Sequence, residues 1–438
     1  MKNLHQVLTQ ELHTLRQQLQ RLDTDALARQ SGFLRRTPRK IPILDFLLAL
    51  VALAAESALT LERVASVIAL AAHCSYSKQA LHKRLNSRIE TFLAQTATAL
   101  FGQLPQAQSL VRGLFQPFRR VLLHDSTVEK LPDHLAKVFP GNRNHLQAFA
   151  ALKIQFISDL LSCQVVHFSL SGFRRNDQAA AIDILGVAQA GDLVIRDLGY
   201  FVVRAFQWLQ ELGAFFLSRW RADVTLYDPR TGARFNLARE LRRYGHLDRQ
   251  VLLGAQKLPV RLVALPVPEA VANERRRKAK TNRDRRRHPN AQKLLLMGWN
   301  LLITNVPRSL WPTKALVAIY RLRWRIEMIF KAWKSHLGLR ELNCHSANLV
   351  RFSVMTKLLF CVLVYRFCQA MELRGHSDRH VSLQRLARIV RACACQLEAI
   401  ILGLTLQEFC EHFLAHHAFY ECRKDRKNYY ELLAAVCS

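Results

Sequence analysis

The chain has 438 residues, half of them hydrophobic, so it can bury a sizeable core divided over two to four structural units, which excludes a disordered tail. Its 64 lysines and arginines outnumber 33 aspartates and glutamates, and the net charge of +31 predicts a polyanion such as DNA as the partner. Ten cysteines without the regular spacing of a disulfide framework, and an N-terminus without a signal peptide, argue against secretion and favour the bacterial cytoplasm.

Residues 1–110 show helical spacing of their apolar side chains and few strand signals, which predicts an all-helical N-terminal domain that binds DNA. The most apolar stretch in it, residues 41–61, contains Asp45 and Glu56, and its uncharged part is too short to span a bilayer. We therefore expect a buried helix there and no membrane partner.

A candidate helix-turn-helix lies inside this domain. Thr60 is a suitable cap for a helix over 61–72, and Ser77 is a suitable cap for a second helix over 78–88. An ordinary pair of packed helices with a basic solvent-facing side fits the same residues, so both interpretations stay open. The basic side chains expected to face outward are Lys78, His82, Lys83 and Arg88.

From residue 120 the apolar residues form short runs, which are typical of strands. The succession over 111–220 predicts a mixed sheet with helices on both faces, the layout of a ribonuclease-H-like core in the α/β class. Asp125 would end the first strand and Asp197 the fourth, so that the two carboxylates lie at neighbouring strand ends. The predicted strands are 121–125, 152–159, 163–171, 192–197 and 214–220, and the predicted helices are 177–189 and 202–213.

Residues 221–312 lose the helical pattern and contain short alternating runs, which predicts a β-rich insertion. The insertion includes a basic run, residues 275–287, with nine lysines and arginines opposed only by Asp284. A solvated loop or a localisation-like tract fits such a run, but in a DNA enzyme we expect it to grip phosphates. The residues expected to do so are Arg275, Arg276, Arg277, Lys278, Arg285, Arg286 and Arg287.

The helical pattern returns at residue 313 and continues to the end of the chain. Residues 313–345 are expected to supply the last helix of the core, and residues 346–438 a helical C-terminal region. That core helix would lie against the sheet with its apolar side and present Glu327 on the other. At 100° per residue the polar stripe holds Tyr320, Arg323, Glu327, Lys331 and Lys334, and the apolar side holds Ile319, Leu322, Ile326, Ile329 and Trp333.

Asp125, Asp197 and Glu327 are the candidate metal ligands and catalytic residues. Like charges held close raise one another's pKa, and divalent cations remove that cost. Hard oxygen ligands select Mg²⁺, with Mn²⁺ as a possible substitute, and two such ions activate the attacking oxygen and stabilise the departing one at a phosphodiester. A turn or capping role fits any single aspartate at a strand end, but the joint placement with the helix of Glu327 favours a metal site. His124 and Ser126 are expected to orient Asp125.

Three short motifs carry a resemblance to a known family. Four polar residues separated by two, three and six positions are similar to the YREK signature of the DDE transposases of bacterial insertion sequences; they are Tyr320, Arg323, Glu327 and Lys334. The sequences HDST and RDLGY, which contain the two aspartates, resemble the acidic boxes of the IS-four group of these enzymes. The resemblance covers roughly residues 115–345.

The resemblance implies a role for each motif residue. Asp125 would bridge two metal ions, while Asp197 and Glu327 would each hold one. Phosphates near the cleaved transposon end would be contacted by Tyr320, Arg323 and Lys334, with Lys331 on the same stripe also expected to bind DNA.

Trp299 resembles the tryptophan that, in related hairpin-forming enzymes, stacks on a base flipped out of the transposon end. A sharply bent strand leaves a base unstacked, and an aromatic surface suits it. An indole in a strand is more often part of the core, so both roles stay open for Trp299.

The resemblance implies a cut-and-paste transposase. Each protomer would bind a terminal inverted repeat, water would nick the transposon end, and the exposed 3′-hydroxyl would drive strand transfer within a homodimer that pairs two ends. One alternative is a repressor without catalysis that binds DNA through residues 60–88 and the basic run, although the acidic triad argues against it. The other is a ribonuclease-H-like nuclease that cuts without end specificity or joining.

Overall fold

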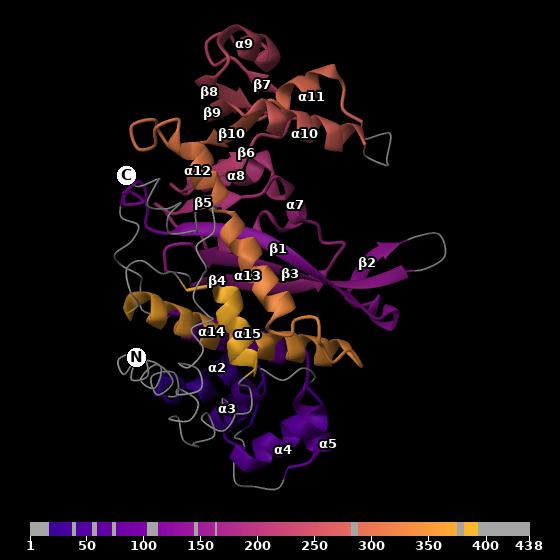
Figure 1. The fold of residues 1–438 in the computed structure, drawn as a ribbon. Coiled ribbons are helices and arrows are strands. Elements are labelled where there is room, and N and C mark those ends of the chain that lie inside the picture. Colours follow the sequence, from indigo (N-terminus) through magenta and orange to yellow (C-terminus); the bar gives the residue numbers. More distant parts are fainter. Residues whose placement is uncertain are drawn as a thin grey trace.

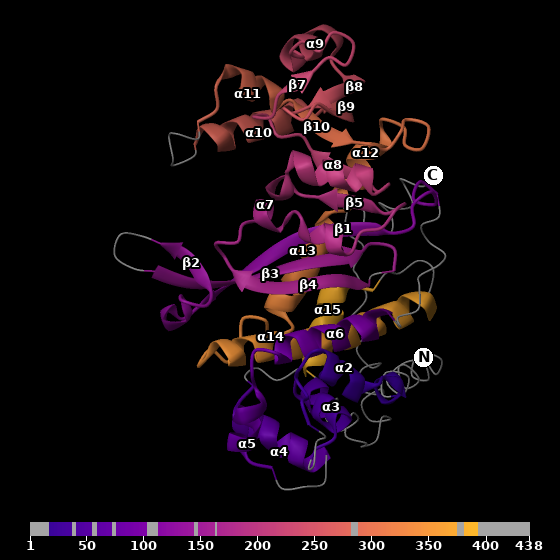
Figure 2. The ribbon, with the colours of Figure 1, turned by 180° about the vertical axis from the view of Figure 1, so that it is seen from behind.

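The computed structural model describes residues 17–36, 41–54, 59–71, 76–102, 113–143, 148–162, 164–281, 288–374 and 381–392. Figure 1 shows a mixed sheet through the middle of the molecule, with the N-terminal helices at one end and the segment 221–312 at the other. The opposite view in Figure 2 shows the same order. The mixed α/β class predicted from the sequence is therefore confirmed. None of the described helices combines the length and apolar character needed to cross a lipid bilayer.

The N-terminal part is helical wherever it is described as far as Gly102, apart from short connections. Its apolar side chains share one hydrophobic cluster with one face of the sheet and with the later helices. This part therefore packs directly on the sheet-bearing half of the chain. The helices are α2 (Thr24–Gln30), α3 (Ile43–Leu53), α4 (Leu61–Ala71), α5 (Lys78–Arg84) and α6 (Ile89–Gly102).

The two helix starts predicted for the helix-turn-helix are confirmed, but the second helix is shorter than expected. Thr60 Oγ1 accepts from the N–H of Arg63 at 3.2 Å, and Ser77 Oγ caps α5 at 3.3 Å. Helix α5 ends at Arg84, and Arg88 donates to the carbonyl of Gly32 at 3.2 Å, so the outward orientation predicted for Arg88 is wrong. Residues 72–75 lie outside the described residues. The side chains that do face solvent are Lys78, His82 and Lys83.

The described strands form one ten-stranded sheet in the order β2-β3-β1-β5-β6-β10-β9-β8-β7, with β4 paired to β3. The β1/β5 and β5/β6 pairs are parallel and the other pairs are antiparallel. The strands are β1 (Val121–Leu131), β2 (Pro140–Arg143), β3 (Ala148–Asp159), β4 (Val165–Gly172), β5 (Leu193–Arg196), β6 (Phe215–Arg219), β7 (Leu226–Tyr227), β8 (Leu247–Leu253), β9 (Leu258–Pro266) and β10 (Trp299–Thr304).

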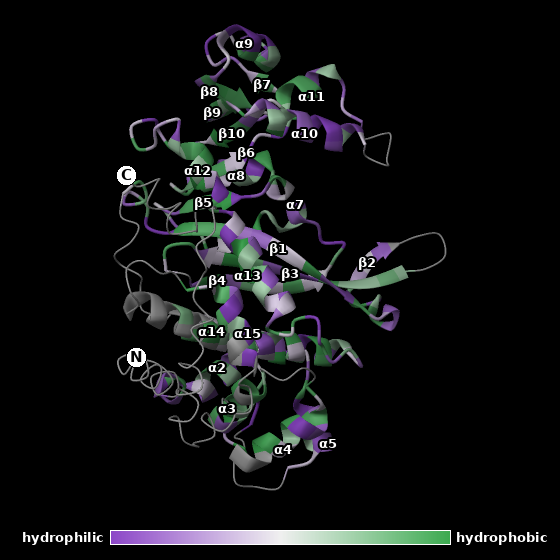
Figure 3. Ribbon diagram, in the orientation of Figure 1, coloured by the Kyte–Doolittle hydropathy of each residue, from purple (hydrophilic) through white to green (hydrophobic). Residues whose placement is uncertain are grey.

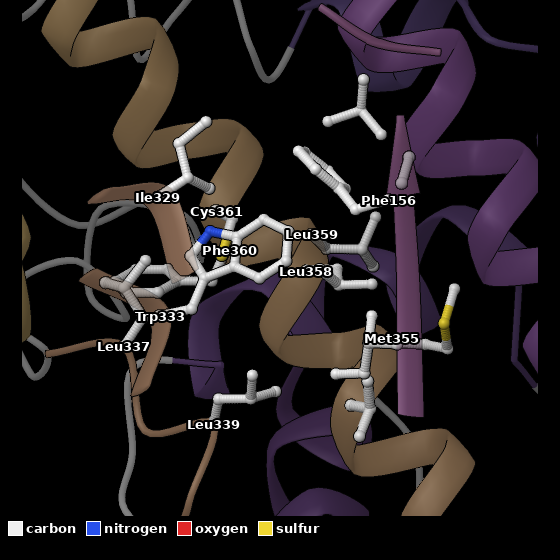
Figure 4. Close-up of a cluster of buried hydrophobic side chains, with 14 of the residues drawn as sticks. Phe156, Ile329, Trp333, Leu337, Leu339, Met355, Leu358, Leu359, Phe360 and Cys361 are labelled. Carbon is white, nitrogen blue, oxygen red and sulfur yellow. The ribbon is translucent and has the colours of Figure 1, made fainter. Parts of the chain in front are cut away.

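Helices lie on both faces of the sheet. Successive strand residues point to opposite sides, so each face carries apolar side chains that helices can cover. Leu123 joins one hydrophobic cluster and Leu122 the other. On the first face, the rings of Phe156 and Trp333 meet at 4.8 Å beside residues of α14 (Figure 4). Each fully buried side chain of this kind contributes about 1.5–3 kcal/mol. The first face carries α12 (Ala315–Arg321), α13 (Trp324–Ser335), α14 (Ala347–Arg374) and α15 (Leu383–Ala392), and the second carries α7 (Asp177–Ala180), the 3₁₀ turns η2 (Asp183–Gly186) and η3 (Leu198–Tyr200), and α8 (Val203–Glu211).

The segment 221–312 extends the same sheet, because β10 pairs antiparallel with β6. It also contains the helices α9 (Leu237–Tyr244), α10 (Glu269–Lys280) and α11 (Ala291–Leu296). The first half of the basic run lies on α10, which is largely hydrophilic in Figure 3, so the loop interpretation is wrong for residues 275–280. The second half, 282–287, lies outside the described residues.

Several element boundaries differ from the sequence prediction. Strand β1 continues to Leu131, so Asp125 lies inside the strand and does not end it. Strand β2 was not predicted, which makes β5 the fifth strand. The helix expected over 177–189 is instead α7 followed by η2. The helices expected beyond residue 392 lie outside the described residues.

Candidate active site

Two of the three predicted carboxylates lie side by side on adjacent strands. Strands β1 and β5 are parallel, and their last paired residues are His124 and Arg196. Asp125 and Asp197 each follow directly, on backbones about 4.8 Å apart. Strand β5 ends at this point, while β1 runs on against β3, so Asp197 begins a turn where Asp125 remains in the sheet.

The third carboxylate comes from a helix that differs from the prediction. In place of one continuous helix, α12 and α13 join through Leu322 and Arg323. The N–H of Arg323 bonds the carbonyl of Tyr320 at 3.2 Å, and that of Ile326 bonds the carbonyl of Arg323 at 3.2 Å, both three residues back. The backbone therefore makes a tighter, 3₁₀-type turn at Arg323. Glu327 lies in the first turn of α13, which follows. The predicted apolar side of the helix is buried throughout.

The guanidinium of Arg323 lies among all three carboxylates. Its Nη1 is 3.0 Å from Oδ2 of Asp125, its Nη2 is 2.6 Å from Oε1 of Glu327, and its Nε is 3.6 Å from Oδ1 of Asp197. One planar cation thus touches three acidic groups that are up to 202 residues apart, from position 125 to position 327. The structure brings the predicted triad together.

Burial controls the protonation of Asp125. Burial raises the pKa of this carboxyl from its ordinary 3.8 to about 7; the N–H of Ser126 and the charge of Arg323 oppose the rise, while Asp197 and Glu327 add to it. Burial alone would lower the pKa of Arg323, but Asp197 and Asp125 raise it overall. The arginine therefore stays charged and Asp125 titrates close to neutral pH.

Tyr320 and Arg219 flank the triad. The hydroxyl of Tyr320 reaches Oδ1 of Asp197 at 3.5 Å, and the guanidinium of Arg219 lies 5.4 Å from the centre of the tyrosine ring. Arg219 is exposed and lies beside Asp197 across the parallel β5/β6 register, in which Ile195 pairs with Leu217. Arg219 was not among the predicted site residues, because its place beside Asp197 depends on the parallel β5/β6 pairing.

The two lysines of the stripe differ in their surroundings. Lys334 Nζ lies 2.8 Å from Oε1 of Glu129 and donates to the carbonyl of Val128 at 2.5 Å, both on β1. This contact fixes α13 over the strand that carries Asp125. Lys331, on the same helix, is exposed.

The tryptophans Trp299 and Trp324 differ in burial. Trp299 begins β10, is half-buried against the second hydrophobic cluster, and donates from Nε1 to the carbonyl of Gly245 at 2.7 Å. Trp324, which follows Arg323, is 61% exposed. Trp324 was not among the predicted site residues; its place directly after the arginine of the stripe was the available signal.

Two of the five basic residues on α10, Arg275 and Arg276, make structural contacts. Arg275 donates to the carbonyl of Trp299 at 3.2 Å and to Asn300 Oδ1 at 2.9 Å, and Arg276 donates to the carbonyl of Leu294 at 3.2 Å. These bonds hold α10 against β10 and α11. Arg277 and Lys278 are exposed, and Arg285, Arg286 and Arg287 lie outside the described residues.

The two neighbours of Asp125 in β1 lie on the opposite face of the sheet. His124 is fully buried, with its ring 4.1 Å from that of Tyr200, and burial lowers its pKa well below the ordinary value, so the ring is neutral. Ser126 donates its N–H to Oδ1 of Asp125 at 2.8 Å and its hydroxyl to Oδ1 of Asp177 at 2.8 Å. Ser126 therefore connects the candidate site to the far face.

The chemistry of the triad suits a hard divalent cation. Within the described ranges, no three Asp, Glu, His or Cys side chains are already arranged to hold a metal ion. At the candidate site the guanidinium of Arg323 itself supplies the positive charge among the carboxylates. Their oxygens are the donors that Mg²⁺ and Mn²⁺ prefer.

Comparison with known proteins gives a consistent result. Residues 116–364 match the family model described as "Transposase DDE domain". The chain is similar to the transposase for insertion sequence element IS231D of Bacillus thuringiensis subsp. finitimus, at 27% identity over 352 residues and 73% of each chain. It is also similar to the transposase for IS1151 of Clostridium perfringens, at 26% identity over 280 residues and 59% of each chain. The matched family region spans all three carboxylates.

Proposed function

Because the chain belongs to the transposase DDE domain family, we propose that Asp125, Asp197 and Glu327 are its catalytic carboxylates. The protein is a DDE transposase of insertion-sequence type, an enzyme that cleaves DNA and transfers strands, and its core is ribonuclease-H-like. The contact of one guanidinium with all three carboxylates is the observation that supports this assignment, because it places the triad within reach of a common cation.

Enzymes of this family use divalent metal ions. For this chain the proposal is two Mg²⁺ ions, replaceable by Mn²⁺, which Asp125, Asp197 and Glu327 would hold. When bound, such ions polarise the scissile phosphate and lower the pKa of the attacking water or 3′-hydroxyl. Arg323 would leave the carboxylates as the ions enter and contact a DNA phosphate, for which its planar fork is suited.

DNA is the substrate, and its recognition is proposed to involve several surfaces. Residues 1–110 would bind the terminal inverted repeats, and two protomers would pair two ends as a homodimer on the bacterial nucleoid. The exposed indole of Trp324 is better placed than that of Trp299 to stack on a base, because Trp299 is half-buried and hydrogen-bonded. The proposed phosphate contacts are Tyr320, Arg323, Lys331 and Lys334, with Arg277 and Lys278 on α10.

The test is cleavage of a supercoiled plasmid that carries the DNA flanking the reading frame on both sides. In Mg²⁺ we expect double-strand cuts at the terminal inverted repeats and joined products in a target plasmid, and neither in EDTA. Binding to the ends without cleavage in Mg²⁺ or Mn²⁺ would contradict the proposed chemistry and favour a repressor. Cutting without end preference or joining would favour a simple nuclease.

The affinity of the DNA-free protein for Mn²⁺ is expected to depend on pH. Burial raises the pKa of Asp125 to about 7, so below that pH a proton occupies the carboxyl and competes with the metal ion. The dissociation constant should rise about tenfold per pH unit below 7 and become constant above it. Calorimetric titration between pH 5.5 and 8.5 measures this, and Asp125→Asn, which lacks the ionisable ligand, should show no Mn²⁺ binding at any of these pH values. A midpoint near pH 4 would contradict the predicted protonation.

A further inference from the structure

A charged cluster lies on the far face of the sheet, directly behind the candidate site. Lys153 of β3 is only 4% exposed, and its Nζ is 2.7 Å from Oδ1 of Asp177 at the start of α7. The same carboxylate oxygen accepts the hydroxyl of Ser126 at 2.8 Å. Burying a lysine is costly unless it is paired, so this ion pair fixes Asp177 against β1 and β3.

Asp177 also contacts the turn that follows Asp197. A Cβ atom added to Gly199 would lie 3.0 Å from Oδ2 of Asp177, so the carboxylate packs against the backbone of η3. The next residue, Tyr200, donates its hydroxyl to Oε1 of Gln155 on β3 at 2.6 Å. The turn is thus held to the same cluster by packing and by a hydrogen bond.

The cluster therefore touches the chain next to both catalytic aspartates. On β1, Ser126 links Asp177 to Asp125, because its N–H donates to the Asp125 carboxylate and its hydroxyl to Asp177. On the other strand, Asp177 packs against Gly199, two residues after Asp197. A shift of Asp177 would change the separation of the two aspartates without altering either of them.

We infer that Asp177, with Lys153 as its counter-ion, is a positioning residue that sets the geometry of Asp125 and Asp197 for metal binding. This inference rests on the proposed function. Groups that orient metal ligands typically change metal affinity by 10- to 100-fold when they are removed. A purely structural ion pair would instead change stability and leave the metal affinity unaltered.

The test measures the Mn²⁺ dissociation constant of the full-length, DNA-free protein by calorimetry, together with its melting temperature in EDTA. Asp177→Asn keeps the shape of the side chain but removes its charge, and we expect Mn²⁺ binding to weaken about tenfold. In the cleavage assay kcat should fall while KM for the DNA ends stays unchanged. The matched control is Asp183→Asn, which breaks a similar ion pair with Arg175 on the same face, and which should leave Mn²⁺ affinity as in the wild type.

A folded Asp177→Asn variant with wild-type Mn²⁺ affinity would overturn the inference. If that variant does not fold, Ser126→Ala provides the test, because it removes only the hydrogen bond from the Ser126 hydroxyl to Asp177. A loss of Mn²⁺ affinity of about threefold supports the inference, and an unchanged affinity overturns it. Asp125→Ala separates this inference from the proposed function. Retained Mn²⁺ binding in Asp125→Ala would reject the proposed metal site itself, whereas loss in Asp125→Ala with none in Asp177→Asn would reject only the role of Asp177.

Discussion

Asp125→Ala is expected to reduce cleavage at the transposon ends by at least about 10³-fold, and Asp197→Ala and Glu327→Ala by similar factors. Each variant removes one of the three carboxylates that lie around the guanidinium of Arg323 and that are proposed to hold the metal ions. The three losses should not add up in a triple variant, because residues that act as a unit fail together. Single-turnover cleavage of a plasmid with paired ends, followed on gels, measures the effect.

The matched control is Asp223→Ala. Asp223 forms an exposed ion pair with Arg221 at 2.7 Å, and exposed pairs contribute about 0–1 kcal/mol, so its loss should leave cleavage within about twofold. All variants should bind end DNA as the wild type does. Cleavage retained in any of the three triad variants would reject that residue as a metal ligand.

The sequence contained enough information to predict Glu327 and its helix. Ile326, Ile329 and Trp333 are spaced so that one side of the helix packs on the sheet, and this placement requires no knowledge of distant residues. The tightened turn at Arg323 could not be predicted in the same way, because no proline or glycine marks it.

The position of Asp125 within its strand was harder to predict. The apolar run ends at Leu123 and the predicted strand at Asp125, yet β1 continues for six more residues because β3 pairs with it as far as Leu131. The polar residues of this part face α13 on one side and the buried Lys153 cluster on the other, so neither face shows an apolar alternation. Pairing between distant segments determined the strand length here, and a local pattern does not reveal that.

Asp177 and Arg219 were missed for a related reason. Asp177 becomes significant through Lys153, which lies 24 positions earlier in the chain, and through a contact with Gly199. Arg219 becomes significant because β6 is parallel to β5 and the register places it beside Asp197. Both relations depend on strand order, which a single sequence does not specify. The family motifs pointed to the three carboxylates, whereas the residues that surround them could be found only from the fold.

Arg323→Gln is expected to separate metal binding from catalysis. In the metal-free protein the guanidinium is the counter-charge for three carboxylates, so its loss should lower the free energy of unfolding in EDTA at pH 8 by about 1–3 kcal/mol. This is less than for a fully buried pair, because Asp197 and Glu327 are partly exposed to solvent. Mn²⁺ should then bind about tenfold more tightly, because no internal cation competes for the carboxylates, and it should restore stability by mass action.

The same variant should cleave DNA more slowly than the wild type, since the arginine is proposed to contact a phosphate once the ions are bound. Tighter Mn²⁺ binding together with slower cleavage is the expected combination, measured by calorimetry, denaturant unfolding and the plasmid assay. Lys331→Gln is the matched control, because it removes one positive charge from an exposed position on the same helix and should alter neither Mn²⁺ affinity nor stability in EDTA. Wild-type Mn²⁺ affinity and wild-type stability in EDTA for Arg323→Gln would show that the guanidinium is not the counter-ion of the triad in the metal-free protein. The proposed exchange of the arginine for metal ions would then be wrong.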